Sequence, residues 1–380
     1  MRHETPSTEP SPTATLMFMP RASVKGRGTA WAIEHRFTSE HHQSVDDGWG
    51  ALEQLAHEES VSSQTQIIEQ RVKTILSGND SPDIPFDLSI NPYRGCEHGC
   101  VYCFARPTHS YLNLSPGLDF ETKVIAKVNA AERLREALAS PSYEALPLNI
   151  GSATDAYQPA ERRLGITRSL IEVLAEYRHP FSIITKSSGI ERDIDLLAPL
   201  ARDRLVSVYV SIPTLAGDLA RVMEPRATAP ERRLRTIERL TRAGIPVGVS
   251  VSPVIPFLNE PELERVLERA RDAGATTAFA TVLRLPWEVN PLFQQWLQTH
   301  FPERAARVMA RVRDLRGGRD NDSRFGQRMS GQGVWAQLLA QRFEKAAQRL
   351  SLGRERIALD LSQFQRPLVA GPALAQASLS

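Results

Sequence analysis

Short apolar runs and helical patterns alternate along the middle of the chain from residue 83 onward. In the first run, Phe86, Leu88 and Ile90 alternate with the polar residues Asp87 and Ser89, which predicts a short strand with one buried face. Later apolar runs of similar length also predict strands. These strands are expected over residues 123–128, 146–151, 181–185, 206–211, 247–251 and 277–283.

Helical patterns separate most of these runs. Residues 129–138 are rich in Ala, Glu, Arg and Leu, and residues 168–177 place apolar residues on one helix face. Pro230 and Pro261, each followed by acidic residues, mark two helix starts. Strands that alternate with such helices predict an α/β fold with a mainly parallel sheet and right-handed crossovers. A doubly wound open sheet has the same alternation and stays an alternative.

The flanking parts of the chain have different patterns. Residues 1–80 lack sustained apolar periodicity, which predicts a largely disordered or loosely packed extension. The strand–helix alternation covers residues 81–290, which are expected to form a partial barrel. The pattern of residues 291–367 predicts an arginine-rich helical extension, and residues 368–380 are expected to form a tail. Within the first part, residues 25–31 read KGRGTAW, which fits either a solvated tether or a flexible loop that closes over a substrate.

The composition fits a protein with a substantial buried core. Of its 380 residues, 41% are apolar, enough for one large domain with additions or for two domains. No apolar run approaches the roughly 18 residues of a membrane span, and the first residues lack the apolar core of a signal peptide. We therefore expect a cytoplasmic protein with no membrane partner. The net charge of +2 indicates no particular partner.

All three cysteines of the chain lie within the segment 96–103, which reads CEHGCVYC. This clustering fits a reducing compartment, in which thiolates are available to a metal. Thiolates are the usual ligands of iron–sulfur clusters, and three of them leave one iron of a four-iron cubane without a protein ligand. That iron can bind a substrate or a cofactor. The motif follows the first predicted strand, and the active sites of parallel β/α barrels lie at the carboxyl ends of their strands.

Two other uses of the cysteines are weaker alternatives. A structural zinc site needs a fourth ligand, which His98 or His109 can offer, but zinc-binding cysteines usually come as two CxxC pairs. A disulfide leaves one thiol over and closes a very short loop.

The spacing CxxxCxxC, with an aromatic residue before the last cysteine, resembles the signature of the radical S-adenosylmethionine (radical SAM) superfamily. The flanking segments SINPYRG (89–95) and FARPTH (104–109) look like the spore photoproduct lyase-like branch, and within it like a bacterial "DNA repair photolyase-like" subgroup. The resemblance extends from about residue 25 to about residue 367. It implies a partial (β/α)6 barrel of radical SAM type.

The resemblance also implies the cofactors and the reaction. Cys96, Cys100 and Cys103 are expected to bind a 4Fe-4S cluster, and the amino and carboxylate groups of SAM to bind the fourth iron. The reduced cluster then cleaves SAM to a 5′-deoxyadenosyl radical, which abstracts hydrogen from a substrate. Such an enzyme needs a one-electron reductant, for example flavodoxin or ferredoxin. The cofactor supplies the hard chemistry, and the protein binds, orients and excludes water.

The polar segment 151–161 resembles the family segment that lies beside SAM. In this segment, the resemblance implies that Thr154 contacts SAM and that Asp155 is its orienting neighbour. The same residues also suit an Asx or Ser/Thr turn that caps the following helix.

Further SAM contacts are implied at the ends of two predicted strands. Lys186 is expected to pair with the SAM carboxylate as a point charge, and Ser211 to make a polar contact. Tyr102 resembles the aromatic residue that packs beside the adenine. An ordinary strand-end serine and simple core packing are the structural alternatives for Ser211 and Tyr102.

The chain departs from spore photoproduct lyase because it has no fourth cysteine to return hydrogen to a product radical. If Asp155 is matched to the family's aspartate, Ser152 falls at the position of that thiol, and a serine O–H bond is too strong to donate hydrogen readily. The substrate is therefore open. The alternatives are a radical SAM modifier of RNA or protein and a non-catalytic iron–sulfur or zinc protein that binds nucleic acid.

Nucleic acid is a candidate partner because of the charge of the helical extension. Residues 303–356 contain 13 Lys or Arg and 6 Asp or Glu. This basic excess, with Arg316, Arg319 and Arg324 in a predicted interruption of the helices, suits a phosphate-bearing ligand. Solvated helix faces would give the same composition.

Overall fold

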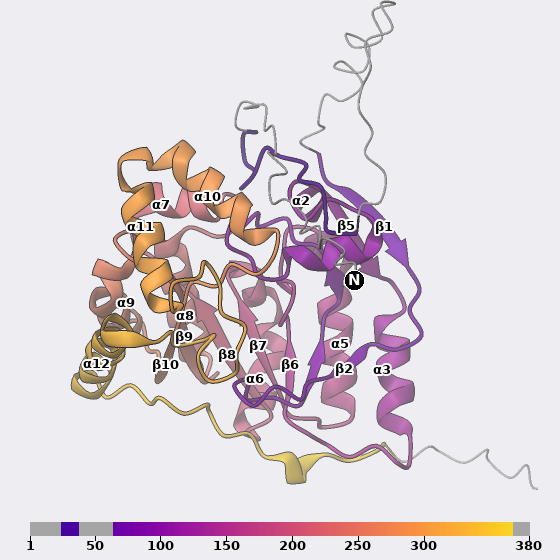
Figure 1. Cartoon of the computed structure of the whole chain (residues 1–380). Coiled ribbons are helices and arrows are strands. Elements are labelled where there is room, and N and C mark those ends of the chain that lie inside the picture. The colour runs from indigo at the N-terminus through magenta and orange to yellow at the C-terminus, as the bar shows by residue number, and fades with distance from the viewer. Residues whose placement is uncertain (1–23, 38–63, 368–380) are drawn as a thin grey trace, which may run out of the picture.

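The computed structural model describes residues 24–37 and 64–367 (Figure 1). Its main sheet has seven strands in the order β10-β9-β8-β7-β6-β3-β2. Neighbouring strands from β3 to β10 pair in parallel, and β2 pairs antiparallel with β3 at the edge. The strands are β2 (Leu76–Gly78), β3 (Leu88–Ile90), β6 (Leu148–Ile150), β7 (Phe181–Thr185), β8 (Val206–Ser211), β9 (Val247–Val254) and β10 (Thr277–Val282).

The order of the parallel strands in the sheet follows their order in the chain. A doubly wound sheet instead reverses its strand order at a switch point. The sheet is also open, because β10 and β2 are its two edges among the residues that the structure describes. The predicted α/β partial barrel is therefore confirmed, and the doubly wound alternative is wrong.

Helices connect the successive parallel strands, as the alternating pattern predicted. Leu170, Ile171 and Leu174 of α5 are fully buried, which explains the apolar face of that helix. Pro230 begins α8, whereas Pro261 lies in the short 3-10 helix η3 just before α9. The connecting helices are α3 (Ala130–Ala139), α4 (Glu161–Leu164), α5 (Ile166–Glu176), η2 (Ser188–Asp193), α6 (Ile194–Arg202), α7 (Gly217–Met223), α8 (Pro230–Arg242), η3 (Glu260–Glu262) and α9 (Leu263–Asp272).

One predicted strand of the barrel lies in another sheet. The run over residues 123–128 forms β5 (Lys123–Lys127), which pairs parallel with β1 (Gln66–Gln70) and antiparallel with β4 (Tyr93–Arg94). An apolar run predicts that a strand is buried, and Val124 of this run is fully buried. The run does not show which strand pairs with it. The connection from β3 to β6 is consequently long, and it contains the cysteine loop, η1 (Arg106–Leu112), α2 (Asp119–Thr122), β5 and α3.

The described part of residues 1–80 contributes strands to both sheets. β1 pairs with β5 and β2 pairs with β3, and Ile75 between them is buried in the core. Residues 64–80 are thus packed on the barrel, although they lack apolar periodicity.

The helical extension follows β10. Its first two helices pack against the cysteine loop, and its third helix packs against α9 and the main core. A second apolar core joins Val101 and Tyr102 of the cysteine loop to Phe293, Trp296 and Val308 of the extension. No helix among the described residues is long and apolar enough to cross a membrane. The elements of the extension are α10 (Val289–His300), α11 (Pro302–Leu315), α12 (Gly333–Arg349) and η4 (Leu361–Gln363).

Candidate active site

The three cysteines lie in a loop that leaves the carboxyl end of β3 through the short strand β4. Gly95 and Gly99 have φ angles of 80° and 68°, a backbone conformation that favours glycine. These residues turn the chain before Cys96 and before Cys100. A side chain at Gly99 would also meet the Glu121 carboxylate, because its Cβ would lie 2.7 Å from Oε2. The path of the loop therefore depends on glycine at both positions.

The thiols of Cys96, Cys100 and Cys103 are free. Cys96 and Cys100 are buried and Cys103 is half-buried. Burial raises the pKa of all three thiols, so their thiolates need a nearby positive centre to be stable. Among the described residues, no three His, Cys, Asp or Glu side chains meet closely enough to hold a single metal ion. Thiolates of a cubane each bind a different iron, so they need not meet at one point. The donor set thus fits the implied cluster.

Asp155 connects the loop after β6 to the end of β7 and to the cysteine loop. Its carboxylate accepts hydrogen bonds from Thr185 Oγ1 and from the backbone N–H of Lys186, both at 2.7 Å. Nδ1 of His98 lies 3.3 Å from its Oδ2. Burial alone would raise the pKa of Asp155, but His98 and the hydrogen bonds outweigh it and hold this pKa below its usual range. Asp155 is therefore an ionised anchor between three chain segments.

The Lys186 side chain lies in a buried cluster of charged and aromatic groups. Its Nζ is 5.9 Å from the centre of the Tyr102 ring. The Tyr102 hydroxyl donates a hydrogen bond to Glu224, and Arg233 forms an ion pair with the same carboxylate. Burial alone would lower the pKa of Lys186, but Cys100 and Glu224 raise it overall. The structure thus brings Lys186 and Tyr102 together beside Cys100.

Thr154 and Ser211 have different surroundings. Thr154 Oγ1 donates to the backbone carbonyl of Gly95 at 2.8 Å, and Gln158 Nε2 donates to the same carbonyl at 3.2 Å. Thr154 therefore fixes the start of the cysteine loop. Ser211 is buried at the end of β8, where its backbone carbonyl accepts a hydrogen bond of 2.8 Å from Arg233 Nη1. Direct contacts of Thr154 and Ser211 with SAM stay predictions.

Several residues that hold the site were not found from the sequence. Arg106 is fully buried, donates to the Cys100 carbonyl at 3.0 Å and forms an ion pair with the fully buried Glu121. Arg106 belongs to the FARPTH segment that carried the resemblance, so that segment was the available signal. Glu224 and Arg233 have no such signal, because they lie outside the recognised motifs and meet only in the fold.

Residues 24–37, which we call the strap, pass over the cysteine loop between α10 and α2 (Figure 1). The backbone N–H of Gly28 donates to Glu121 Oε2 at 2.9 Å, and Arg27 Nη1 donates to the Glu121 carbonyl at 2.7 Å. A Cβ atom at Gly28 would lie 1.7 Å from the carbonyl oxygen of Gly99. The solvated-tether alternative for residues 25–31 is therefore wrong, because this segment packs directly on the cysteine loop.

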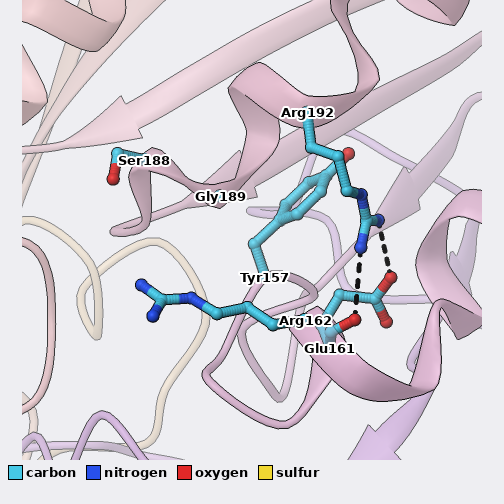
Figure 2. A pocket seen from close by; sticks show the side chains of 6 residues that line it. All are labelled: Tyr157, Glu161, Arg162, Ser188, Gly189 and Arg192. Carbon is cyan, nitrogen blue, oxygen red and sulfur yellow. Dashed lines mark hydrogen bonds and ion pairs between the residues drawn. The ribbon is translucent and has the colours of Figure 1, made fainter.

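A pocket of about 290 Å³ lies beside the site, between the loops that follow β6 and β7 (Figure 2). Arg192 donates to Glu161 Oε1 at 2.8 Å, and Figure 2 shows Arg162 extending away from this pair. None of the predicted cluster or SAM residues lines this pocket, so the predicted cofactor site lies outside it. Its lining consists of Tyr157, Glu161, Arg162, Ser188, Gly189 and Arg192.

The predicted phosphate contacts of the helical extension are only partly compatible with the structure. Arg316 is 1% exposed and donates to the backbone carbonyls of Leu283, at 2.6 Å, and Gln327, at 2.9 Å. It therefore cannot contact a phosphate at the surface, and this part of the prediction is wrong. Many other arginines of the extension form ion pairs, including Arg313–Asp320, Arg324–Asp322, Arg342–Glu264, Arg349–Glu268 and Arg354–Glu344.

Comparison with known proteins identifies the family. The family model of the radical SAM superfamily matches residues 90–270, which include the cysteine loop, β6, β7, β8 and β9. An uncharacterised protein of Mycobacterium tuberculosis is 39% identical over 234 residues, which cover 61% of this chain and 68% of the relative. The chain belongs to the radical SAM superfamily. An uncharacterised protein of Methanocaldococcus jannaschii is 25% identical over 243 residues, covering 64% of this chain and 86% of that relative.

Solved structures agree with the predicted branch at the level of the fold. A tyrosine-to-phenylalanine mutant of spore photoproduct lyase has a TM-score of 0.54 and 14% identity, with 77% of this chain and 82% of that chain covered. A mutant of the same enzyme with bound AdoMet and dinucleoside spore photoproduct has a TM-score of 0.52, 14% identity and the same coverage. At this identity the likeness concerns the fold alone.

Membership of the radical SAM superfamily confirms an enzyme that uses a 4Fe-4S cluster and SAM and that needs a reductant. It overturns the alternative of a non-catalytic nucleic-acid-binding protein.

Proposed function

We propose that this radical SAM enzyme binds its cluster through the cysteine loop and binds SAM between that loop and the ends of β6, β7 and β8. The main support is the network around Asp155, which joins three chain segments carrying the predicted cofactor residues. Strand ends that meet at one edge of a parallel sheet are the usual location of such sites. The proposed residues are Cys96, Cys100 and Cys103 for the cluster, and Tyr102, Thr154, Asp155, Lys186 and Ser211 for SAM.

Each protein group has a role that its surroundings support. When bound, the reduced cluster would supply the electron that cleaves SAM to methionine and a 5′-deoxyadenosyl radical, and this radical would abstract hydrogen from the substrate. Lys186 offers a positive charge to the SAM carboxylate. Asp155 keeps the backbone of Lys186 in place, and the strap and the second apolar core keep water from the cysteine loop.

The substrate and the hydrogen donor are the open parts of this function. Ser152 forms a hydrogen bond of 3.1 Å with Asn91 Nδ2 and supplies no thiol. Repair of a thymine dimer with a cysteine donor is therefore not proposed. A substrate that contains nucleotides is favoured by the surface described in the next subsection, and modification of RNA or of a protein is the alternative. A cytoplasmic reductant such as flavodoxin or ferredoxin is the proposed electron donor.

The test is anaerobic reconstitution of the full chain with iron and sulfide. We expect about four irons per chain, an electron paramagnetic resonance signal that changes when SAM is added, and 5′-deoxyadenosine after reduction. Dithionite and reduced flavodoxin are used as separate electron donors. A reconstituted cluster that never yields 5′-deoxyadenosine with either donor would contradict the proposed function.

Replacing Lys186 with alanine is expected to weaken SAM binding about tenfold or more while the cluster remains. A charge-assisted contact contributes roughly 1.5 to 3 kcal/mol, and its loss reduces affinity accordingly. Affinity is measured by SAM titration of the cluster's electron paramagnetic resonance signal. Lys123→Ala is the matched control, because Lys123 pairs with Asp119 at 3.1 Å on the half-exposed side of α2. Equal SAM affinity in both variants would leave Lys186 without a role toward SAM.

Replacing Asp155 with asparagine is expected to destabilise the apo-protein by about 1 to 3 kcal/mol. An asparagine NH2 group must point either at the Lys186 N–H or at the Thr185 hydroxyl and the Tyr157 N–H, which now donate to the carboxylate. In both orientations a backbone N–H group loses its acceptor. Urea unfolding of the apo-protein measures the change. Asp218→Asn is the control, since the Asp218 side chain is almost fully exposed beside Arg221. Similar unfolding midpoints for the two variants would show that Asp155 is not an anchor.

A further inference from the structure

Arg284, just after β10, lies beside the cysteine loop without a carboxylate partner in the described parts of the chain. Its guanidinium carbon is 5.5 Å from the centre of the Phe104 ring, and Phe104 directly follows Cys103. Its Nη1 is 3.8 Å from the sulfur of Met329, and its buried Nε has no hydrogen-bond partner. A half-buried guanidinium with an unused donor is costly unless an anion or another acceptor binds it.

The position of Arg284 is fixed by the loop between α11 and α12, residues 316–332. This loop passes in front of the sheet in the view of Figure 1. Arg316 holds it to β10, because this buried side chain donates to the carbonyls of both Leu283 and Gln327. The backbone N–H of Val282 also donates to the Met329 carbonyl at 2.9 Å. Arg284 and the segment that carries Arg328 are thus held side by side.

Positive charge exceeds negative charge around this junction. Arg284 lies close enough to Arg328 and to Arg316 for their charges to repel, and the pKa of Arg284 is lowered first by burial and then by Arg328. The charge of Asp83 acts against this lowering of the Arg284 pKa, but Arg328 already binds Asp83, with Nε 2.9 Å from Oδ2. An oxyanion that binds here would therefore form an ion pair with Arg284, whose charge no carboxylate of the described residues neutralises.

Phe104 adds a flat apolar surface to this cation. The residue is 51% exposed although it adjoins a cluster cysteine. An exposed ring beside a guanidinium can stack against a planar group while the cation binds a neighbouring phosphate. A nucleotide unit carries both groups at adjacent positions.

We propose that Arg284 binds a phosphate of the substrate and that Phe104 stacks on the base of the same nucleotide unit. This inference rests on the proposed function, because it places the substrate beside the cysteine loop. The unit can belong to a free nucleotide or to a single strand, since both present the same phosphate and base.

The test compares Arg284→Gln with Arg307→Gln in the reconstituted enzyme. Arg307 is the matched control, because it is exposed and its guanidinium carbon also lies over an aromatic ring, 4.0 Å from the centre of Phe257. Its replacement with glutamine removes the same charge. The probes are thymidine monophosphate and a fluorescent single-stranded decathymidylate. We expect Arg284→Gln to weaken binding of at least one probe about tenfold or more, and to flatten the salt slope for the oligonucleotide by about 0.7. Phe104→Leu should weaken binding at an unchanged salt slope.

The pattern across the probes identifies the source of the phosphate. An effect confined to thymidine monophosphate assigns a small substrate, and an effect on the oligonucleotide assigns a strand. Equal affinities of the Arg284 and Arg307 variants for both probes, or no binding by the wild type, would overturn the site. So would a loss of SAM affinity in Arg284→Gln, because the anion would then belong to the cofactor. Arg284→Gln should form 5′-deoxyadenosine in the absence of substrate as fast as the wild type does. If the wild type itself forms no 5′-deoxyadenosine, the proposed function is refuted, independently of the phosphate site.

Discussion

Single replacement of Cys96, Cys100 or Cys103 with alanine is expected to abolish the 4Fe-4S cluster. A cubane held by three thiolates already has one iron without a protein ligand, and losing another leaves two irons without one. The burial of Cys96 and Cys100 also removes water as a ready replacement ligand at these two positions. After anaerobic reconstitution, each variant should contain little iron and sulfide, show no cluster absorbance and produce no 5′-deoxyadenosine.

The apo-proteins provide the control for these cysteine variants. Circular dichroism of each apo-variant should match that of the apo wild type, because the cysteine loop is also held by Arg106, Glu121 and the strap. Loss of the cluster with retained secondary structure then reports on ligation and not on folding. A complete four-iron cluster in any single variant would defeat the assignment of that cysteine.

The local parts of the fold could be predicted from the sequence. The strands β7 and β8 begin and end at the predicted residues, 181–185 and 206–211, because each apolar run forms a buried strand with clear ends. β5 was placed in the wrong sheet, because its partners β1 and β4 are chosen by long-range packing. Periodicity reports whether a strand is buried, whereas the choice of partner depends on the connections and on the surrounding surface.

The candidate site shows the same division. The cysteine spacing is a local pattern, and Asp155 and Lys186 follow predicted strands, so these residues could be proposed from the sequence. Glu224 lies 122 residues after Tyr102, to which it is hydrogen-bonded, and its partner Arg233 lies on another helix. A buried charge cluster of this kind leaves no periodic signal, because it exists only when distant segments meet.

Charge composition was the least reliable guide to function. The basic excess of residues 303–356 suggested a phosphate-binding surface, but Arg316 supports the loop between α11 and α12 from inside. Arg284 lies outside the counted segment, yet it is a half-buried cation beside the cysteine loop for which the described residues supply no carboxylate partner. The accessibility and pairing of individual arginines are therefore better indicators of a ligand than the net charge of a segment.

Replacing Gly28 with alanine is expected to separate the strap from the cysteine loop. The new Cβ would lie 1.7 Å from the Gly99 carbonyl oxygen, far inside van der Waals contact. The clash is between a Cβ fixed to the strap backbone and a backbone oxygen of the cysteine loop, so no side-chain rotation can relieve it. One of them must move, which breaks the hydrogen bond from Gly28 to Glu121 and opens the loop to solvent. We expect iodoacetamide to alkylate the cysteines of the apo-variant about tenfold faster or more, since a local destabilisation above about 1.4 kcal/mol shifts an opening equilibrium by that factor. The cluster of the reconstituted variant should also bleach faster in air.

Gly26→Asn is the matched control for Gly28→Ala, because Gly26 belongs to the same strap and a Cβ there meets nothing within 4 Å. Its φ angle of 77° lies in the left-handed region, which asparagine tolerates better than most residues. This variant should keep the alkylation and bleaching rates of the wild type. If Gly28→Ala behaves as Gly26→Asn does, the strap does not protect the cysteine loop, and water must be excluded from that loop by the apolar core around Val101 and Trp296 instead.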